Sequence, residues 1–298
     1  MKKNQIKLVI IAMAMMITMA FSASVQADYQ IGILAKRGAQ KTYEKWNSTA
    51  EYLTRRVGER FTVVPLKFVE IDQAVKTGRI DFLLANSAFY VVMREKYGVK
   101  AIATLMNAKK GLATYEFGGV IFARRNSSIK KLSDIKGKKF MCVKYSSFGG
   151  AHMAWRLLME NGIDPRKDCK AFLEGGTHDK VVMAVKSGAV DVGTVRSDTL
   201  ERMEEEGLIS MSQFYVINQI RDSFPFAHST RLYPVWPMAK TVKTDTIIAR
   251  KVSKALMLIE ADSKVSRDSK VTGWTYPADY EPVRDCLVDI KYGIFANM

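Results

Sequence analysis

Apolar and polar positions follow two alternating spacings along this chain of 298 residues. Short apolar runs are typical of strands, and apolar residues three or four positions apart are typical of amphipathic helices. The two spacings alternate, which predicts an α/β fold with mainly parallel sheets. The predicted strands lie at 29–34, 61–68, 80–85, 99–106, 117–124, 139–144, 169–173, 190–195 and 212–217, and the longer helices at 42–57, 71–77, 88–97, 151–161, 179–187, 198–206, 244–260 and 279–291.

One local pattern occurs twice. The segment AVKTGRID at 74–81 recurs 110 positions later as AVKSGAVD at 184–191. In both copies an amphipathic stretch ends at a Gly, as helices commonly do, and an Asp precedes a short apolar strand. With the same offset, residues 30–34 align with 140–144. The alternative is that a Gly followed by a strand recurs in any two α/β lobes, but the constant offset favours two similar lobes.

One further segment indicates that the chain crosses between the two lobes a second time. Residues 224–237, rich in Pro and aromatic residues, return the chain to the first lobe before its last two helices. Two crossings form a hinge, and hinged lobes can close around a ligand. The predicted division is a signal peptide at 1–27, lobe I in two pieces at 28–123 and 225–298, and lobe II at 124–224.

The first residues have the pattern of a secretory signal. Three Lys precede an apolar run from 8 to about 23, and Val25, Gln26 and Ala27 form a small-residue cleavage site. An uncleaved anchor is the alternative, which the polar residues near the site disfavour. No later stretch approaches the roughly 20 apolar residues that span a bilayer. We therefore expect cleavage after Ala27 and a soluble periplasmic protein of 271 residues, the 298 less the 27 of the signal.

Net charge and cysteine content limit the classes of partner, disulfide and metal site that we expect. The formal net charge is +16, which can attract nucleic acid, anionic lipid or small anions. We expect no nucleic-acid partner, because the protein is exported and no nucleic-acid motif is present. Cys142 and Cys169 fall near neighbouring predicted strands and can pair, whereas Cys286 lies in the last helix. Because no CxxC or His-rich spacing occurs, we expect no metal and no cofactor.

The repeat also indicates candidate ligand residues. Asn86 and Arg196 come five positions after the repeated Asp, at the carboxyl ends of strands that face the ligand in open α/β sheets. Ser87 and Ser197 follow as predicted N-caps. A cation directly after a buried strand needs an anion, and a guanidinium can bind an oxyanion through two N–H groups. The alternative for Arg196 is a salt bridge to Asp179 or Asp198.

Three helix starts offer backbone N–H groups to an anion. They are the loops at 34–40 and 144–152 and the segment 175–182. Ordinary capped turns are the alternative. In the third segment, His178 can donate to an oxyanion while Asp179 orients it, and a surface capping pair is equally consistent. His228 can line the site or pack in the core. The candidate residues are Arg37, Gly38, Ser147, His178 and Asp179 in these segments, and His228 outside them.

An enzyme is the rival class. Ser147, His178 and Asp179 can be written as nucleophile, base and orienting acid. No G-x-S-x-G elbow and no Cys–His signature accompanies them. We therefore expect a binding protein without catalytic residues.

Several segments resemble a known family. Residues 117–140, 175–195 and 273–293 resemble the phosphonate/phosphite-type periplasmic solute-binding proteins, which have the two-lobed type II periplasmic binding protein fold. The resemblance covers about residues 29 to 295. Within this group, residues 37–53, 146–155 and 224–237 look closest to the sensor branch, the input domains of tetrathionate-sensor-like histidine kinases.

The resemblance implies a function and maps part of a site. In phosphonate-binding members a Ser/Thr-rich loop at a helix start holds the oxyanion, and it maps onto Ser146, Ser147 and Gly149, with His178 following. This chain has a thinner Ser run and carries Arg196 at a strand end, which favours an oxyanion without an amine. The resemblance thus implies capture of a small phosphorus or sulfur oxyanion for a membrane partner, either an ABC permease or, as the alternative, a sensor kinase.

Overall fold

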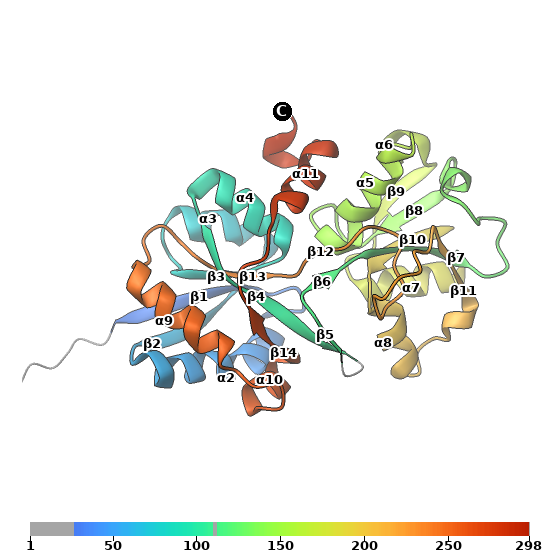
Figure 1. The fold of residues 1–298 in the computed structure, drawn as a ribbon. Helices are drawn as coiled ribbons and strands as arrows, with labels where there is room; N and C mark the ends of the chain where they lie inside the picture. The colour runs from blue at the N-terminus through green and yellow to red at the C-terminus, as the bar shows by residue number, and fades with distance from the viewer. Residues whose placement is uncertain (1–26, 110–111, 298) are drawn as a thin grey trace, which may run out of the picture.

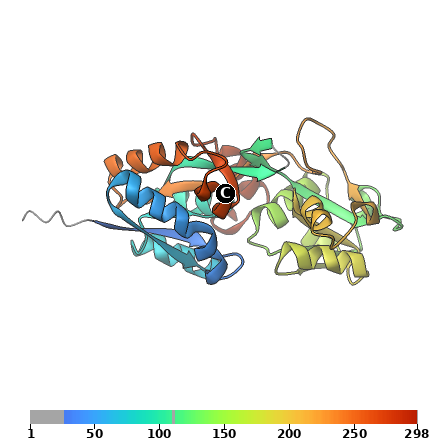
Figure 2. The same ribbon diagram turned by 90° about the horizontal axis from the view of Figure 1, so that it is seen from below.

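The computed structural model describes residues 27–109 and 112–297, which form two lobes side by side (Figure 1). The predicted signal peptide falls on residues 1–26, outside the described residues. Figure 2 shows the same two lobes from below. Each lobe has its own sheet and its own helices, so the predicted two-lobed α/β fold is confirmed.

Lobe I is built on a sheet with the strand order β14-β4-β13-β3-β1-β2, to which β5 adds beside β4. Strand β1 runs parallel to β2 and β3, as predicted, whereas β13 is antiparallel to both of its neighbours. The return strand β13 therefore enters between β3 and β4 and makes this sheet mixed. The strands are β1 (Asp28–Leu34), β2 (Arg60–Leu66), β3 (Phe82–Leu84), β4 (Lys100–Lys109), β5 (Leu112–Thr114), β13 (Pro237–Lys240) and β14 (Val271–Thr275).

The helices of lobe I pack their apolar faces on this sheet. Along α2, Trp46, Ala50, Leu53 and Val57 are buried at three- and four-residue spacings, and Gly58 ends the helix in the left-handed conformation. The helices are α2 (Ala39–Val57), η1 (Phe68–Glu70), α3 (Ile71–Lys76), α4 (Ser87–Tyr97), α9 (Thr246–Met257), α10 (Lys264–Ser269), α11 (Glu281–Asp289) and η5 (Gly293–Phe295).

Lobe II is built on a five-stranded sheet with the order β11-β7-β10-β8-β9. Strand β7 pairs antiparallel with β10 and β11, so the boundary predicted between residues 123 and 124 falls inside a strand of this lobe. The strands are β7 (Gly119–Arg124), β8 (Lys139–Cys142), β9 (Ala171–Glu174), β10 (Val192–Arg196) and β11 (Phe214–Ile217). The helices are η2 (Leu132–Ile135), η3 (Phe148–His152), α5 (Met153–Glu160), α6 (Pro165–Asp168), α7 (His178–Ser187), α8 (Thr199–Glu205) and η4 (Met211–Gln213).

Two short strands connect the lobes. Strand β6 (Glu116–Phe117) and strand β12 (Tyr233–Pro234) form an antiparallel pair between the two sheets (Figure 1). Before β12, Ser229 and Thr230 still bind the backbone of β7 through their hydroxyls, each at 2.9 Å. The return crossing therefore lies nearer to β12 than to residue 224, where the predicted lobe II ends.

The last helix also joins the lobes. In α11, Glu281 pairs with Arg94 of α4 at 2.7 Å, and Asp289 pairs with Arg156 of α5 at 2.7 Å. Since α4 belongs to lobe I and α5 to lobe II, α11 bridges them at one side (Figure 1). Any closing motion must keep or break these contacts.

The repeated segment performs the same task in both lobes. The backbone N–H and carboxylate of Asp81 bind the backbone of Gln30 at 2.8 Å, and those of Asp191 bind Lys139 at 3.1 and 2.8 Å. The strand registers make Ile31 equivalent to Phe140, a separation of 109. The alignment of residues 30–34 with 140–144 was therefore wrong by one residue, because the loops between strand and repeat differ in length.

Three negative findings concern the described residues. Cys142, Cys169 and Cys286 are free thiols, so the suggested pairing of Cys142 with Cys169 is absent from the structure. Within 27–109 and 112–297, no helix has the length and apolar character to cross a bilayer. No group of three His, Cys, Asp or Glu side chains is placed to hold a metal ion in the same ranges.

Candidate ligand-binding site

The candidate site is a group of cationic and imidazole side chains contributed by both lobes. Lobe I supplies Lys36 and Arg37 from the loop after β1 and Lys45 from the second turn of α2. Lobe II supplies His178 at the start of α7 and Arg196 at the end of β10. We call these five residues the interlobe cation cluster.

Burial and mutual repulsion both disfavour the charged forms of the lysines in this cluster. The pKa of Lys36 is lowered to about 7. The larger cause is desolvation of the ammonium group by the surrounding protein atoms, and the next is the charge of Arg196 in the other lobe. The pKa of Lys45 is lowered to about 8 by the same two causes in the same order. Solvent still reaches Lys36, since the residue lies where the lobes face each other and outside either core. The protein therefore holds cations together without enough negative charge to balance them.

His178 is held as a neutral hydrogen-bond donor. Thr177 caps α7 through its side chain, which fixes His178 at the first position of the helix. The backbone N–H of Arg196 donates to His178 Nδ1 at 3.2 Å. Burial, followed by Lys36 and Arg196, lowers the pKa of His178 well below its usual value. Because Nδ1 accepts, the ring proton of the neutral imidazole resides on Nε2, which can donate to a ligand.

Arg196 is fixed in place more by packing than by ion pairing. Its guanidinium carbon lies 4.4 Å from the centre of the Phe117 ring in the first crossing. Its Nε is 3.8 Å from a carboxylate oxygen of Asp198, and this buried nitrogen has no hydrogen-bond partner among the described residues. An ion pair with Asp198, one of the alternatives, is thus present in a loose form. The second alternative, Asp179, pairs with Arg202.

The loop before η3 comes close to Arg196. Phe148 begins a π turn that continues into α5, and Ser147 precedes it without a side-chain capping bond. A Cβ atom on Gly149 would lie 2.6 Å from the Phe117 ring and 3.3 Å from Cβ of Arg196. Glycine is required at this position because a side chain would collide with the hinge. The structure thus brings Gly149 beside Arg196, with Ser146 and Ser147 just before it in the chain.

The equivalent loop of lobe I has a simpler form. Gly38 stands before α2 with a φ of 95°, and Arg37 precedes it with an exposed side chain. Gly38 and Ser147 occupy the same place, one residue before the helix of their lobe. Arg37 also lowers the pKa values of Lys36, Lys45 and His178, which places its charge near the cluster.

Asn86 has a different task from Arg196. Its side-chain oxygen accepts the backbone N–H of Phe89 at 3.0 Å, so Asn86 caps α4. The predicted caps were wrong, because both serines bind crossing segments instead. Ser87 donates to the carbonyl of Pro234 at 2.6 Å, and Ser197 accepts the N–H of Gly118 at 3.1 Å.

Two predicted residues are engaged elsewhere. His228 is buried with its ring nitrogens 2.8 Å from the carbonyl of Thr230 and 3.2 Å from Asp222, within its own loop. Its packing beside Phe224 agrees with the alternative of a core histidine. Asp179 is occupied by Arg202, and a triad would need His178 Nδ1 to donate to this carboxylate, whereas that nitrogen accepts a backbone N–H.

Sequence reasoning missed three lysines. Lys36 lies over the Trp236 ring at 5.1 Å, and Lys45 shares its environment with Arg196. Lys144 of lobe II lies 5.2 Å from the Phe68 ring of lobe I, a contact between the lobes. A signal was available for two of them, because Lys36 and Lys144 each stand two residues after the equivalent strands β1 and β8.

One family model and one relative match most of this chain. Residues 31–281 match the family model described as ABC transporter, phosphonate, periplasmic substrate-binding protein. The tetrathionate sensor histidine kinase TtrS of Salmonella typhimurium is 29% identical over 265 residues, which are 88% of this chain and 44% of the kinase. The chain thus spans less than half the length of this relative.

Solved structures share the fold at low sequence identity. A binding protein component of an ABC phosphonate transporter from Pseudomonas aeruginosa superposes with a TM-score of 0.70 at 18% identity, covering 89% of this chain and 87% of that one. PhnD1 from Prochlorococcus marinus in complex with methylphosphonate has a TM-score of 0.67 at 14% identity, covering 87% and 97%. XAC2383 from Xanthomonas citri bound to ATP has a TM-score of 0.69 at 18% identity, covering 89% and 98%.

Proposed function

The chain belongs to the phosphonate-type periplasmic substrate-binding protein family of ABC transporters, and on this premise we propose that it binds a small oxyanion at the interlobe cation cluster. One observation carries the proposal. Burial and, next to it, the charge of Arg196 in lobe II lower the pKa values of Lys36 and Lys45 in lobe I and so disfavour their charged forms. A bound anion relieves this repulsion, so the free energy of binding includes the recovery of an unfavourable interaction within the protein.

Each member of the cluster has a distinct task in this proposal. Arg196 offers planar N–H groups that can bind two oxygens of one ligand. His178 offers Nε2–H from the first turn of α7, where the helix dipole also favours negative charge. Lys36 and Lys45 supply charge from the opposite lobe. Because donors come from both lobes, the ligand holds the lobes together when the hinge closes.

The acidic residues nearby argue against a ligand that carries an amine. Asp179 is paired with Arg202, and Asp198 lies beside Arg196. An ammonium group would therefore meet mainly cations in the cluster. We propose a phosphorus or sulfur oxyanion without an amine.

The membrane partner follows from the family and from one relative. Family membership favours an ABC importer as the partner. The similarity to TtrS, which covers 88% of this chain, supports the second candidate, a membrane sensor that reads the ligand-bound state. Gene deletion separates the two: loss of uptake supports the importer, and loss of ligand-dependent transcription with normal uptake supports the sensor.

Ligand screening tests the proposal directly. Thermal unfolding of the purified protein is measured with phosphite, methylphosphonate, sulfite, thiosulfate and tetrathionate, and with neutral sugars as controls. A ligand of the folded state raises the melting temperature by mass action. We expect at least one oxyanion to do so. A rise with a neutral metabolite and none with any oxyanion would contradict the proposal, and chemical conversion of the ligand during incubation would favour the enzyme alternative.

A further inference from the structure

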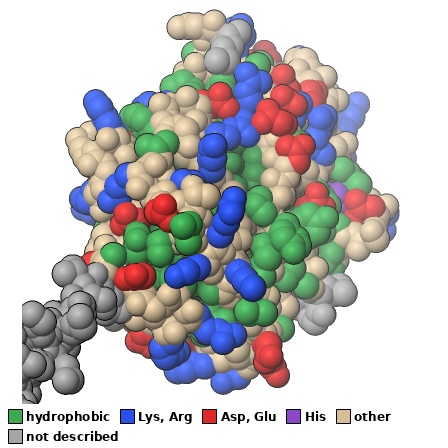
Figure 3. Space-filling model, turned by 60° about the vertical axis from the view of Figure 1, so that its left-hand side comes forward, with side chains coloured by type: hydrophobic (Ala, Val, Ile, Leu, Met, Phe, Trp, Pro, Cys, Tyr) green, Lys and Arg blue, Asp and Glu red, His purple; other side chains and the backbone are tan. Residues whose placement is uncertain are grey.

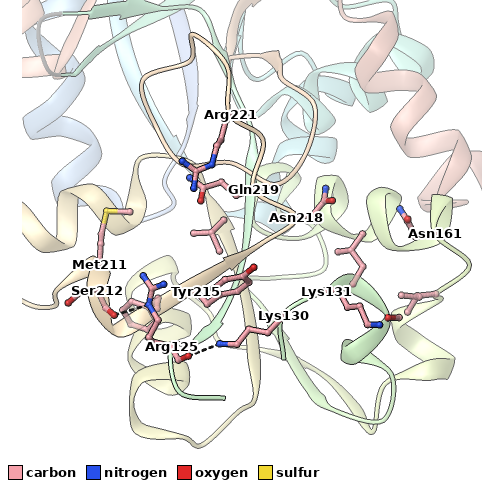
Figure 4. Close-up of a pocket in the computed structure, with 15 residues that line it drawn as sticks. Arg125, Lys130, Lys131, Asn161, Met211, Ser212, Tyr215, Asn218, Gln219 and Arg221 are labelled. Atoms are coloured by element: carbon pink, nitrogen blue, oxygen red, sulfur yellow. Dashed lines mark hydrogen bonds between the residues drawn. The ribbon is translucent and has the colours of Figure 1, made fainter. Parts of the chain in front are cut away.

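A groove of about 820 Å³ lies at the edge of the lobe II sheet (Figure 4). Its floor includes Phe214, Tyr215 and Val216 of β11, the outermost strand of the sheet. One wall comes from the segment that leads into η2, and the other from the loop after β11. The groove shares no lining residue with the interlobe cation cluster, so it is a separate feature.

The charge of the groove is entirely positive. Arg125, Lys130, Lys131 and Arg221 line it, and no Asp or Glu does. Figure 4 shows Arg221 on one side and Arg125 with Lys130 on the other, with Tyr215 between them. Asp134, the acidic residue nearest in sequence to the lysines, accepts the backbone N–H groups of Lys130 and Lys131 at 2.9 and 3.1 Å.

Other nearby carboxylates are also engaged. Asp222 accepts the backbone N–H of Phe224 at 2.9 Å and lies 3.2 Å from His228, and Glu204 accepts the backbone N–H of Met211 at 2.8 Å. These acids therefore fix the loops around the groove and leave its lining basic.

Two of the cations are held along the walls by protein contacts. Lys130 donates to the carbonyl of Arg125 at 2.6 Å and lies 4.6 Å from the Tyr215 ring. Arg125 donates to the carbonyl of Ser212 at 3.3 Å. Such contacts reduce the conformational freedom that a ligand must otherwise remove, so these charges are partly ordered before binding.

The register of β11 determines which backbone groups face outward. Arg125 donates its N–H to the carbonyl of Gln213 at 2.8 Å, and the ladder continues with Phe214 opposite Arg124 and Tyr215 opposite Ala123. Hydrogen-bonded and non-hydrogen-bonded pairs alternate in an antiparallel ladder, so the N–H and C=O groups of Phe214 and Val216 point away from β7. The N–H of Phe214 donates to the carbonyl of Met211 at the end of η4, so the outward groups left for a partner are the C=O of Phe214 and the N–H and C=O of Val216. No described strand pairs with this outer edge.

We propose that the β11 groove binds an extended acidic segment of a protein partner, which adds to the sheet as a further strand. Backbone hydrogen bonds to the C=O of Phe214 and to the N–H and C=O of Val216 supply the affinity, and carboxylates that meet the four cations supply the specificity. Edge strands with basic residues usually resist pairing with copies of themselves, because like charges repel. The same charges admit an acidic strand and exclude a second copy of this chain.

The test uses a seven-residue acidic probe, acetyl-Glu-Val-Glu-Thr-Glu-Val-Glu-amide, with a fluorescent label. Fluorescence anisotropy at low salt measures binding of this peptide and of one with N-methyl groups at every residue, which has no backbone N–H to donate to a strand edge on either side. We expect the acidic peptide to bind, and the N-methylated peptide and a Lys-for-Glu peptide to bind at least about tenfold more weakly. Equal binding of the N-methylated peptide would overturn the proposal, as would no binding of the acidic one.

A pair of matched charge reversals locates the contact. K131E/R221E changes two groove residues, and K136E/K170E changes two exposed lysines of the same lobe outside the groove. We expect only the first variant to lose about tenfold or more in peptide affinity. Equal loss in both would mean general charge attraction and overturn the proposal. Thermal shifts with an oxyanion should be retained in both variants, so this test fails independently of the proposed function.

Discussion

The two copies of the repeated segment differ most where their residues face the junction of the lobes. Asp81 and Asp191 bind the backbone of the equivalent strands β1 and β8, and Ser87 and Ser197 each bind a crossing segment. Asn86 and Arg196 occupy equivalent positions and do different work, since one caps a helix and the other adds a cation. The repeat therefore keeps the backbone scaffold equal and lets the residue at this position vary.

The two lobes also contribute different kinds of side chain to the proposed site. Lobe II provides the rigid donors, because Arg196 is packed on Phe117 and His178 is bonded to the backbone of Arg196. Lobe I provides lysines whose charge is easily removed, with pKa values lowered to about 7 and 8. We infer that lobe II binds the ligand first and that the lysines respond to it. Figure 3 shows Lys and Arg side chains running down the middle of one face, a basic surface consistent with attraction of anions.

The largest expected effect is on ligand binding by Arg196→Ala. Removing one partner of a buried charge pair costs about 2–5 kcal/mol of binding free energy, and Arg196→Lys should recover only part, because an ammonium lacks the planar fork. Calorimetric titration with the best oxyanion measures both.

A matched control for this variant exists in the same lobe. Arg166 lies 4.4 Å from the Trp155 ring, as Arg196 lies from Phe117, and is outside the cluster. Arg166→Ala should bind like the unmodified protein. Equal affinity of Arg196→Ala and Arg166→Ala would remove Arg196 from the site.

The next effect concerns the close approach of the lobe II loop to the hinge. In Gly149→Ala the new Cβ would lie 2.6 Å from the Phe117 ring, and such overpacking costs about 1–3 kcal/mol of the free energy of unfolding. A Cβ on Gly38, the glycine at the equivalent helix start in lobe I, meets no atom within 4 Å, so Gly38→Ala suffers only backbone strain at its φ of 95°. Urea unfolding compares them, and a larger loss in Gly38→Ala would refute the packing argument.

A smaller effect is expected for Asn86→Ala. Loss of the cap on α4 should lower the free energy of unfolding by about 0.5–2 kcal/mol, while oxyanion affinity changes little. Denaturation and titration of the same sample separate the two quantities. Asn86→Asp keeps the capping oxygen and serves as the control. A selective loss of affinity in Asn86→Ala would show that the two equivalent positions both contact the ligand.

The smallest effect is on the pH dependence of binding. Only protonated Lys36 attracts an anion, and the bound anion raises its pKa above the free value of about 7. Affinity should therefore fall, by roughly two- to tenfold, as pH rises above about 7 and should level off past the bound-state pKa. Titration with a ligand of constant charge measures this, and Lys36→Gln should flatten the profile. An unchanged slope in that variant would assign the effect to another group.

The stability of the free protein should respond to Lys36 in the opposite sense. Because the folded pKa of Lys36 is lowered to about 7, the unfolded chain binds more protons than the folded chain between pH 7 and the usual lysine value. The contribution of Lys36 to the free energy of unfolding therefore rises with pH across this window. Comparison of the unmodified protein with Lys36→Gln by chemical denaturation isolates the contribution.

Much of this protein could be predicted from local pattern. The alternation of strand and helix, the Gly that ends each repeated helix and the presence of two similar lobes follow from residue spacing, because they depend on neighbours along the chain. Arg196 was predicted as a site residue for the same reason, as a cation directly after an apolar strand. The roles of Ser87 and Ser197 were mispredicted, since their partners, Pro234 and Gly118, lie far away in sequence.

The sequence by itself determined the two α/β lobes, their linkage by two crossings and the basic character of the chain. Only the tertiary structure decided which cations meet. Lys36 and Lys45 are ordinary basic residues in their own segments, and their pKa values are lowered only when folding desolvates them and brings Arg196 near from the other lobe. Secondary structure is set by nearby residues, whereas charge repulsion depends on distance in space, and folding alone makes residues 36 and 196 neighbours.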